Sequence, residues 1–240
     1  MLESQTDQLE QIEFDVGVAE QPRVVRLDPP KVVEVARASA LQRGAKRALD
    51  VVLSSVMLLV ALPVFGLIAV AIKLDDRGPV FYLQERWGFR GRRFRVFKFR
   101  SMVPDAGTRQ AREDDERVTR IGKFLRRTGL DELPQLLNIW RGEMSFVGPR
   151  ALAVNEILLD GPEGYLNYEH VPGFWERMAV RPGLTGQATI YLPKDADPAL
   201  KFAQDVEYVA KQSIWTDISL IVVSFWISFR GKWETRSTKL

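Results

Sequence analysis

The run VVLSSVMLLVALPVFGLIAVAI, Val51 to Ile72, contains 22 residues without a charged side chain. As a straight helix it would extend about 33 Å, which is long enough to cross the hydrocarbon core of a bilayer once. The core helix of a soluble domain rarely keeps so long an uncharged run. The sequence therefore predicts that this segment inserts into a membrane.

Two features of the run favour a re-entrant helix over a simple crossing, which the length also allows. Pro63 lies near its middle, where a proline removes a backbone hydrogen bond and kinks the helix. Basic residues lie on both flanks, and the positive-inside tendency would keep both ends cytoplasmic. These residues are Arg43, Lys46 and Arg47 before the run and Lys73 and Arg77 after it. We predict a kinked membrane helix over residues 41–74 that enters and leaves on one face.

The segments on either side differ in character. Residues 1–40 show no sustained helical or strand period and contain Pro29 and Pro30, so we expect a loosely ordered tail. The tail also lacks the basic start and apolar run of a secretory signal. Residues 75–240 mix helical patterns with short β-branched and aromatic runs. This pattern predicts an α/β domain that is mostly helical, with short strands.

Several elements of that domain can be placed along the chain. We expect strands at Pro79–Leu83 and Phe94–Phe99, a turn at Gly88–Arg93 between them, and a helix at Val118–Arg127. Ile218–Phe229 is an uncharged run of 12 residues, which is too short to span a bilayer. Polar residues at helical spacing within and before it fit an amphipathic helix in the membrane interface, although a core-facing helix has the same pattern.

Composition limits the kinds of site that the chain can hold. There is no cysteine, which excludes disulfides and thiolate metal sites, and the single histidine, His170, cannot build a histidine-rich zinc site. The net charge is only +3, yet Arg86–Arg100 carries seven basic residues and no acidic one. Such a run suits nucleic acid, anionic lipid or a phosphorylated substrate, or it is a solvated strand edge. The apolar segment argues against nucleic acid.

A pair of adjacent carboxylates, Asp131 and Glu132, stands out in the stretch TGLDELPQLLNIWRGEMSFVGPR, Thr128 to Arg150. With Asp131 as the N-cap of a helix, Pro134 falls in the first turn, where a proline is tolerated. An alternative frame with Thr128 as the cap moves Pro134 into the helix interior. We prefer the frame with Asp131 as the cap, in which Leu136, Leu137 and Trp140 form the apolar face and the helix ends at Gly142.

Either frame places the carboxylates near the positive end of a helix dipole and among arginines. Both effects favour the ionised form of Asp131. An ionised carboxylate can attack phosphorus or carbon, or bind a hard cation, but it can also serve only as a cap. A second feature, the turn predicted at Arg181–Gly186 (RPGLTG), could cradle a phosphate through backbone N–H groups, or it is an ordinary surface loop.

Three motifs in fixed order resemble the bacterial sugar transferases of the monotopic phosphoglycosyl transferase superfamily. They are KFRSM at Lys98–Met102, RVTRIGKFLRRTGLDELPQLLNIWRGEMSFVGPR at Arg117–Arg150, and RPGLTG at Arg181–Gly186. The resemblance extends from about Lys46 to the C-terminus. It implies a re-entrant membrane helix joined to a small cytoplasmic catalytic domain, residues 75–240, with interfacial amphipathic helices. The predicted membrane helix agrees with that architecture.

The resemblance also implies an activity and a place for it. Members transfer a sugar 1-phosphate from a UDP-sugar to a polyprenyl phosphate, usually undecaprenyl phosphate, and release UMP. The reaction takes place at the cytoplasmic face of the bacterial inner membrane and begins the assembly of O-antigen, capsule, exopolysaccharide or glycoprotein glycans. The implied partners are thus the UDP-sugar, undecaprenyl phosphate and membrane lipids, without nucleic acid. A homo-oligomer is compatible with the sequence.

The resemblance assigns roles to six residues. Asp131 corresponds to the nucleophile, which would hold the phosphosugar covalently, and Glu132 to its partner. Magnesium is implied as the cofactor, and we assign its ligation to the same two carboxylates. The basic residues that would bind the substrate phosphates are Lys98, Arg126, Arg150 and Arg181.

The chain departs from the family pattern at two positions. The motif commonly continues GPRP, but here Ala151 follows Arg150; and Leu62 stands before Pro63, where members often have a serine. Two other classes of protein remain open on the residues alone. A membrane-associated phosphohydrolase would pass the phosphoryl group to water, and a scaffold would use the basic run only to bind lipid.

Overall fold

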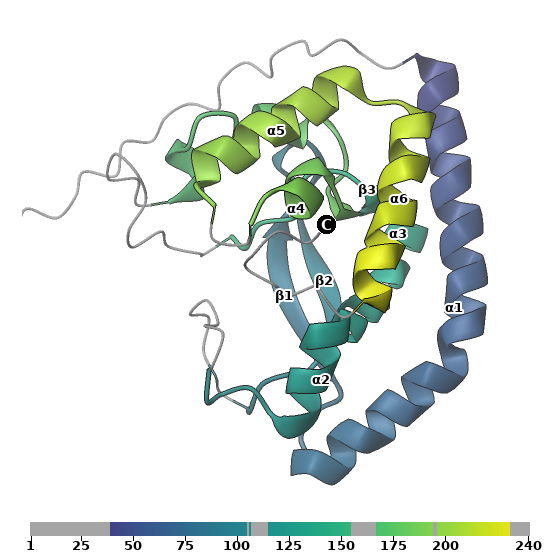
Figure 1. Ribbon diagram of the computed structural model, residues 1–240, viewed down its shortest axis with the longest axis vertical. Helices are drawn as coiled ribbons and strands as arrows, with labels where there is room; N and C mark the ends of the chain where they lie inside the picture. Colours follow the sequence, from purple (N-terminus) through teal and green to yellow (C-terminus); the bar gives the residue numbers. More distant parts are fainter. Residues whose placement is uncertain (1–38, 105, 107–114, 155–166, 194–195, 231–240) are drawn as a thin grey trace, which may run out of the picture. The chain divides into compact units, whose positions relative to one another are not determined.

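The computed structural model describes residues 39–104, 106, 115–154, 167–193 and 196–230 (Figure 1). The predicted tail lies outside these residues except for its last two positions. Those two begin the first helix, α1 (Ala40–Asp76), which is capped by Ser39. The Ser39 hydroxyl accepts a hydrogen bond from the Gln42 amide, and the Gln42 side chain accepts one from the Ser39 amide, so two otherwise unpaired N–H groups are satisfied.

The predicted apolar helix is confirmed as part of α1, a single helix of 37 residues with Pro63 inside it. By length and composition α1 could cross a membrane. Its axis bends partway along (Figure 1), as expected of a helix that lacks one backbone hydrogen bond at a proline. Large apolar side chains along one side are exposed: Val52, Val56, Leu59, Val60, Leu62, Leu67, Val70 and Leu74.

Both ends of α1 are bonded to the rest of the domain. Near its start, Arg47 donates to the carbonyls of Ile139 and Trp140, each at 2.7 Å. Asp50, which is buried, accepts from the Ser145 hydroxyl at 3.1 Å and from the Phe146 amide at 3.0 Å. At the other end Asp76 pairs with Arg100, and Asp75 accepts from the Ile121 amide at 3.2 Å. The helix is therefore anchored to the domain at both of its ends.

The two predicted strands form an antiparallel hairpin, β1 (Phe81–Trp87) and β2 (Arg93–Phe99), joined by a single 3₁₀ turn, η1 (Phe89–Gly91). The first strand is longer than expected because its polar second half still pairs with β2. The register sets Tyr82 opposite Lys98 and Arg86 opposite Phe94. Since side chains alternate along a strand, Arg86 and Lys98 share one face of the hairpin.

The helix predicted at Val118–Arg127 is present as α2 (Arg120–Thr128), with Thr119 as its N-cap. The predicted helix with Asp131 or Thr128 as its N-cap is wrong. Asp131 is not an N-cap, and Thr128 ends α2 rather than starting a helix. Gly129, at φ 74°, closes α2 in the left-handed conformation, and the chain continues into a 3₁₀ helix, η2 (Leu130–Gln135). Pro134 has no N–H for an α-helical bond to residue 130, which favours the tighter 3₁₀ turns here.

The α-helix begins only at Leu136, as α3 (Leu136–Arg141), and ends at Gly142 as predicted. The predicted apolar face of Leu136, Leu137 and Trp140 is only partly right, since Leu136 is buried and Leu137 is partly exposed. Leu136 and Ile139 are fully buried, whereas Trp140 is 51% exposed.

The predicted RPGLTG turn is instead a short strand, β4 (Gly183–Thr185), parallel to β3 (Ser145–Val147). The two backbones approach so closely that a Cβ on Gly148, Gly183 or Gly186 would overlap backbone atoms of the other segment. The motif's glycines therefore permit backbone contact rather than a phosphate-binding turn.

We expect Gly186→Ala to destabilise the protein by about 3 kcal/mol, because the added methyl meets the Gly148 carbonyl, which cannot move aside like a flexible side chain. Thermal unfolding in detergent micelles, followed by circular dichroism, measures the effect. Gly44→Ala is the matched control: it lies on an exposed helical position with no atom within 4 Å of the added methyl. Equal melting temperatures for the two variants would contradict this packing.

The C-terminal part adds α4 (Gln187–Tyr191), α5 (Pro198–Lys211) and α6 (Ile214–Phe229), with short 3₁₀ turns η4 (Tyr168–His170) and η5 (Glu176–Ala179) before them. The main core cluster is formed by side chains of β2, α3, β3, α4, α5 and α6. A second cluster joins η5 and α5 through Phe174, Met178 and Phe202. A third joins the latter half of α1 to Phe99 and Leu125.

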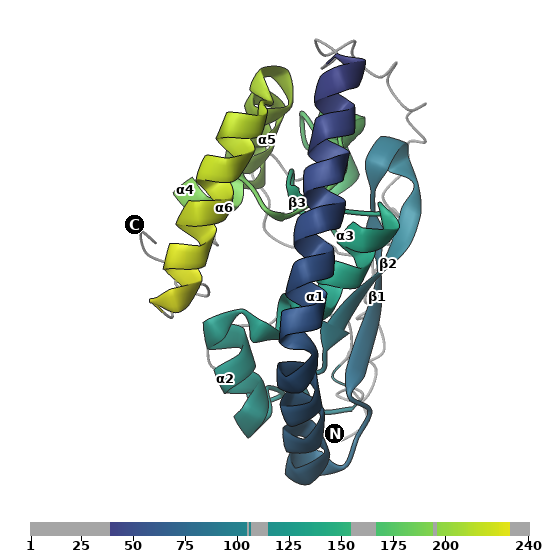
Figure 2. The same cartoon turned by 90° about the vertical axis from the view of Figure 1, so that its right-hand side faces the viewer.

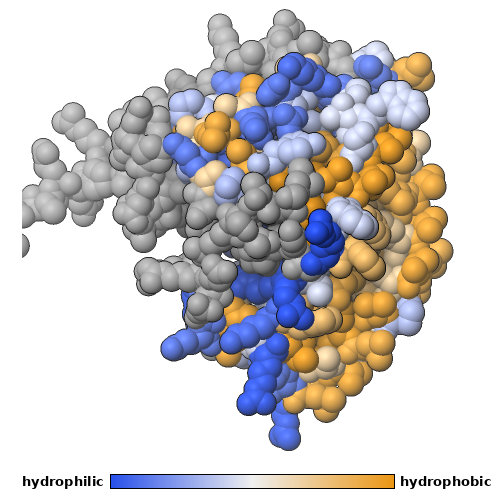
Figure 3. Space-filling model, viewed as in Figure 1, coloured by the Kyte–Doolittle hydropathy of each residue, from blue (hydrophilic) through white to orange (hydrophobic). Residues whose placement is uncertain are grey.

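Helix α6 lies beside α1 (Figure 2) and presents an unusual face to the domain. Its polar residues Asp217 and Ser224 are buried, whereas the exposed side carries Trp215, Phe225, Trp226 and Phe229. Figure 3 shows apolar residues gathered along the edge where α1 and α6 lie. This distribution contradicts a purely core-facing helix, since the aromatic side chains point away from the domain.

Candidate active site

The carboxylate pair lies on η2 and is almost completely enclosed. Asp131 is 8% exposed and Glu132 7%. Leu130 and Leu133, which flank the pair, pack into the same cluster as Ile68 and Ile72 of α1. The segment that carries the carboxylates is thus packed against the latter half of the long apolar helix.

Two cations from different elements converge on Glu132. The Lys98 ammonium, on β2, donates to Glu132 Oε1 at 2.8 Å. The Arg150 guanidinium, just after β3, places Nη2 3.7 Å from the same oxygen. The structure thereby brings three of the six predicted site residues together, Glu132, Lys98 and Arg150, and Asp131 is the chain neighbour of Glu132 on η2.

The electrostatics of this cluster keep Glu132 ionised. Burial by itself acts to raise the pKa of the carboxyl group. The charges of Lys98, Arg150 and Arg86, together with the Lys98 hydrogen bond, outweigh burial and hold the pKa at about 2. Glu132 is therefore an anion at any physiological pH, and it compensates part of the positive charge around the pair.

The remaining two predicted phosphate-binding residues lie differently. Arg126 is in the last turn of α2, five positions before Asp131, and its Nε is buried. Arg181 lies two positions before β4 in the chain. Its Nε donates to the carbonyl of Gly142, the residue that follows α3, at 2.7 Å. Burial and the charge of Arg47 lower the pKa of the Arg181 guanidinium. Arg181 is not among the residues that line the hollow around Glu132.

The sequence analysis missed Arg86 as a member of the site. Its charge acts on Glu132, and its Nη1 donates to the Ala151 carbonyl at 2.6 Å, next to Arg150. Arg86, Lys98, Glu132 and Arg150 line one hollow. The signal was present in the sequence, because a hairpin with this turn sets residues 86 and 98 on one face.

The donor set fits a hard cation of the Mg²⁺ type. Among the described residues no cluster of three or more histidine, aspartate or glutamate side chains is present, so the protein ligands would be the two carboxylates. Magnesium is commonly held by one or two carboxylates together with substrate phosphates and water. The contacts of Glu132 with Lys98 and Arg150 both use Oε1, so its other oxygen can face such an ion.

The fold and the site together define a class of protein: an α/β domain built on a long apolar helix, with a buried carboxylate pair of which one member contacts two cations. The chain belongs to the bacterial sugar transferase family, whose sequence model matches residues 41–231. That match includes every element described except the first residue of α1.

Similar curated proteins carry related names. An undecaprenyl-phosphate glucose phosphotransferase of Komagataeibacter xylinus is 44% identical over 188 residues, which is 75% of this chain and 35% of that protein. A UDP-glucose:undecaprenyl-phosphate glucose-1-phosphate transferase of Escherichia coli is 40% identical over 81% of this chain and 42% of its own. The exopolysaccharide production protein PSS of Rhizobium leguminosarum is 43% identical over 73% of this chain and 90% of its own. The chain therefore spans less than half of the first two proteins and most of the third.

Proposed function

We propose that the protein is a phosphoglycosyl transferase that moves a sugar 1-phosphate from a UDP-sugar to undecaprenyl phosphate. The products are a polyprenyl-diphospho-sugar and UMP. Family membership and the names of the relatives support the reaction class. The name of the Rhizobium relative supports a role in exopolysaccharide production, in which the proposed reaction would be the first membrane step.

One observation carries this proposal: Glu132 contacts Lys98 and Arg150, and the segment that holds Asp131 and Glu132 packs against α1 through Leu130 and Leu133. Cations next to carboxylates suit a diphosphate substrate, because they offset its charge as phosphorus is attacked. Contact with an apolar helix suits an acceptor that is itself a lipid phosphate. A membrane-associated phosphohydrolase could share both features, and it would differ in passing the phosphoryl group to water instead of to the lipid.

The reaction is proposed to take two displacements at the same phosphorus. A carboxylate oxygen of Asp131 attacks the β-phosphorus of the UDP-sugar; the bond to the bridging oxygen breaks, and UMP leaves with the electron pair. The sugar phosphate remains on Asp131 as an acyl phosphate. An oxygen of undecaprenyl phosphate then attacks that phosphorus, and the Asp131 carboxylate is released. Two displacements divide one difficult exchange into two easier steps.

The surrounding residues would bind and neutralise the phosphates. The Arg150 side chain is 46% exposed, so it can reach an incoming diphosphate and still lie near Glu132. Lys98, Arg126 and Arg181 remain proposed phosphate ligands, with Lys98 the best placed of the three. Asp131 and Glu132 would hold Mg²⁺, which when bound neutralises the diphosphate and the leaving UMP.

For the membrane we propose that α1 is re-entrant and that the domain lies at the cytoplasmic face of the inner membrane. Both ends of α1 are bonded to the same domain, which supports entry and exit on one side. The exposed aromatic residues of α6, next to α1, are the type that occupies a membrane interface. On this arrangement the carboxylate pair lies near the lipid headgroups, where the acceptor phosphate is found.

Incubation of the purified protein with a panel of UDP-sugars, undecaprenyl phosphate and Mg²⁺ tests the function. UDP-glucose is the first donor to try, because two similar proteins are named for glucose transfer. We expect UMP and a polyprenyl-diphospho-sugar with at least one donor. UMP and free sugar 1-phosphate formed without need of lipid would instead indicate a phosphohydrolase, and no product from any donor with folded protein would refute the proposal.

A further inference from the structure

The segment that carries Arg150 is held by its backbone from two sides. The Arg150 carbonyl accepts a hydrogen bond from Arg177 Nη2 at 2.8 Å, and the Ala151 carbonyl accepts one from Arg86 Nη1 at 2.6 Å. Just before it, the Gly148 amide donates to the Thr185 carbonyl at 3.0 Å. The peptide of Arg150 is thus fixed, while its side chain extends toward Glu132.

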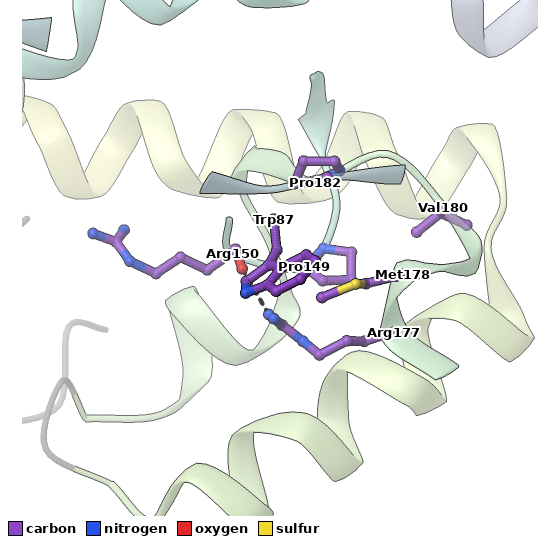
Figure 4. A pocket seen from close by; sticks show the side chains of 8 residues that line it. Trp87, Pro149, Arg150, Arg177, Met178, Val180 and Pro182 are labelled. Carbon is purple, nitrogen blue, oxygen red and sulfur yellow. Dashed lines mark hydrogen bonds between the residues drawn. The ribbon is translucent and has the colours of Figure 1, made fainter. Parts of the chain in front are cut away.

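The residue that binds the Arg150 carbonyl is one half of a buried ion pair. Arg177, on η5, donates to Asp205 Oδ2 on α5 through Nε at 2.9 Å and Nη2 at 2.6 Å. Both side chains are nearly inaccessible, at 3% and 4%. The guanidinium also lies 4.5 Å from the centre of the Phe202 ring. Figure 4 shows Arg177 directed at the Arg150 backbone, with the Arg150 side chain extending the other way.

Burying an ion pair in a protein core is energetically unfavourable compared with burying apolar side chains. Removing two charges from water costs several kcal/mol per ion, and apolar residues of similar size often stabilise a core at least as well. Apolar residues cannot, however, donate a hydrogen bond to the Arg150 carbonyl. Nη2 of Arg177 serves the Asp205 carboxylate and that carbonyl together, and the planar fork of arginine allows both contacts at fixed angles.

We infer that Arg177 and Asp205 are positioning residues for Arg150. Asp205 fixes the Arg177 guanidinium, Arg177 fixes the Arg150 peptide, and the fixed peptide directs the Arg150 side chain to the phosphate that is attacked. The inference rests on the proposed function, because it concerns the arginine expected to bind the substrate phosphates. A half-exposed arginine on a loose loop would sample many orientations, and each would cost binding energy in the transition state.

Arg177→Met/Asp205→Leu separates positioning from stability. It removes both charges together, so no unpaired charge stays buried, but the Arg150 carbonyl loses its donor. We expect a melting temperature near that of the wild type, kcat/KM for transfer lowered about tenfold or more, and most of the loss in kcat. Amide hydrogen exchange across residues 147–153 should become at least several-fold faster, while exchange in α2 stays the same.

Two controls complete the experiment. Lys211→Met/Glu207→Leu removes an exposed ion pair from the same helix α5 and should change neither activity nor exchange. In an Arg150→Ala background, the Arg177→Met/Asp205→Leu change should cost little further activity, because its effect acts through the side chain already removed.

The experiment distinguishes failure of the positioning role from failure of the proposed function. If the wild type transfers no sugar phosphate, the proposed function fails, and the exchange measurement alone decides whether the pair holds the segment. If the wild type is active and the double variant keeps its rate and its exchange pattern, the positioning role is wrong. Activity that falls by the same factor with and without Arg150 would also overturn it.

Discussion

Asp131→Asn is expected to abolish sugar-phosphate transfer, with a loss on the order of 10⁴-fold or more. The amide has the shape of the carboxylate but no charge, so it cannot form the acyl phosphate that the first displacement requires. Asparagine fits the same enclosed position, where the native side chain is 8% exposed, and the fold should persist. Intact-protein mass after incubation with UDP-sugar and Mg²⁺, without lipid acceptor, measures the step directly.

The wild type should gain the mass of one sugar phosphate and lose it when undecaprenyl phosphate is added, whereas Asp131→Asn should gain nothing. Glu116→Gln, which removes a charge from an exposed position, controls for the change in net charge and should behave as the wild type. If the adduct also forms in Asp131→Asn, the nucleophile would be the neighbouring Glu132 and not Asp131. Turnover without any adduct in the wild type would indicate direct transfer and leave Asp131 as a metal ligand.

Local patterns predicted much of the fold. The uncharged run predicted the long helix because no other element keeps so many apolar residues together, and runs rich in β-branched and aromatic residues predicted the two strands that form the hairpin. The 3₁₀ helix at Leu130–Gln135 was missed because capping rules treat a proline near a carboxylate as an α-helical start. The strand at Gly183–Thr185 was missed because a glycine-rich motif is typical of a turn, and only the close approach of Gly148 explains its glycines.

The candidate site was predicted less completely, for a physical reason. The two carboxylates are adjacent in the sequence, and Lys98 and Arg150 were found through the family motifs. Contacts between distant segments leave no periodic signal: Arg177 and Asp205 are 28 positions apart and belong to different elements. Their pairing depends on how η5 packs against α5. The sequence also could not show that the side of α6 with Asp217 and Ser224 faces the domain while its aromatic side is exposed, since either side of an amphipathic helix can do so.

Lys98→Met is expected to lower kcat/KM about a hundredfold or more at neutral pH and to make activity sensitive to mild acid. In the native protein burial raises the pKa of Glu132, and the charges of Lys98, Arg150 and Arg86 with the Lys98 hydrogen bond outweigh it and hold the value at about 2. The substitution removes both the Lys98 charge and its hydrogen bond. Burial is then opposed by fewer charges, and the pKa of Glu132 must rise.

The sign of the pH effect follows from the native value. A carboxyl group whose pKa is lowered on folding stabilises the protein above its unfolded value, near 4.5, and that stabilisation disappears only as the pH falls toward 2. Glu132 therefore contributes no acidic limb to the native pH–rate profile at pH 5 and above. In Lys98→Met protonation of Glu132 begins at a higher pH, so the acidic limb should shift upward, with activity recovering as the pH increases.

The pH dependence of kcat/KM, measured for the wild type and the variant in the same micelles, tests this prediction. Lys123→Met is the matched control, because Lys123 is an exposed cation on α2 and its loss should leave the profile unchanged. Lys98→Arg should restore part of the rate and most of the native profile, since it keeps a charge beside Glu132. A Lys98→Met profile with the native acidic limb but a lower rate at every pH would show that Lys98 acts on the substrate phosphate alone and does not set the ionisation of Glu132.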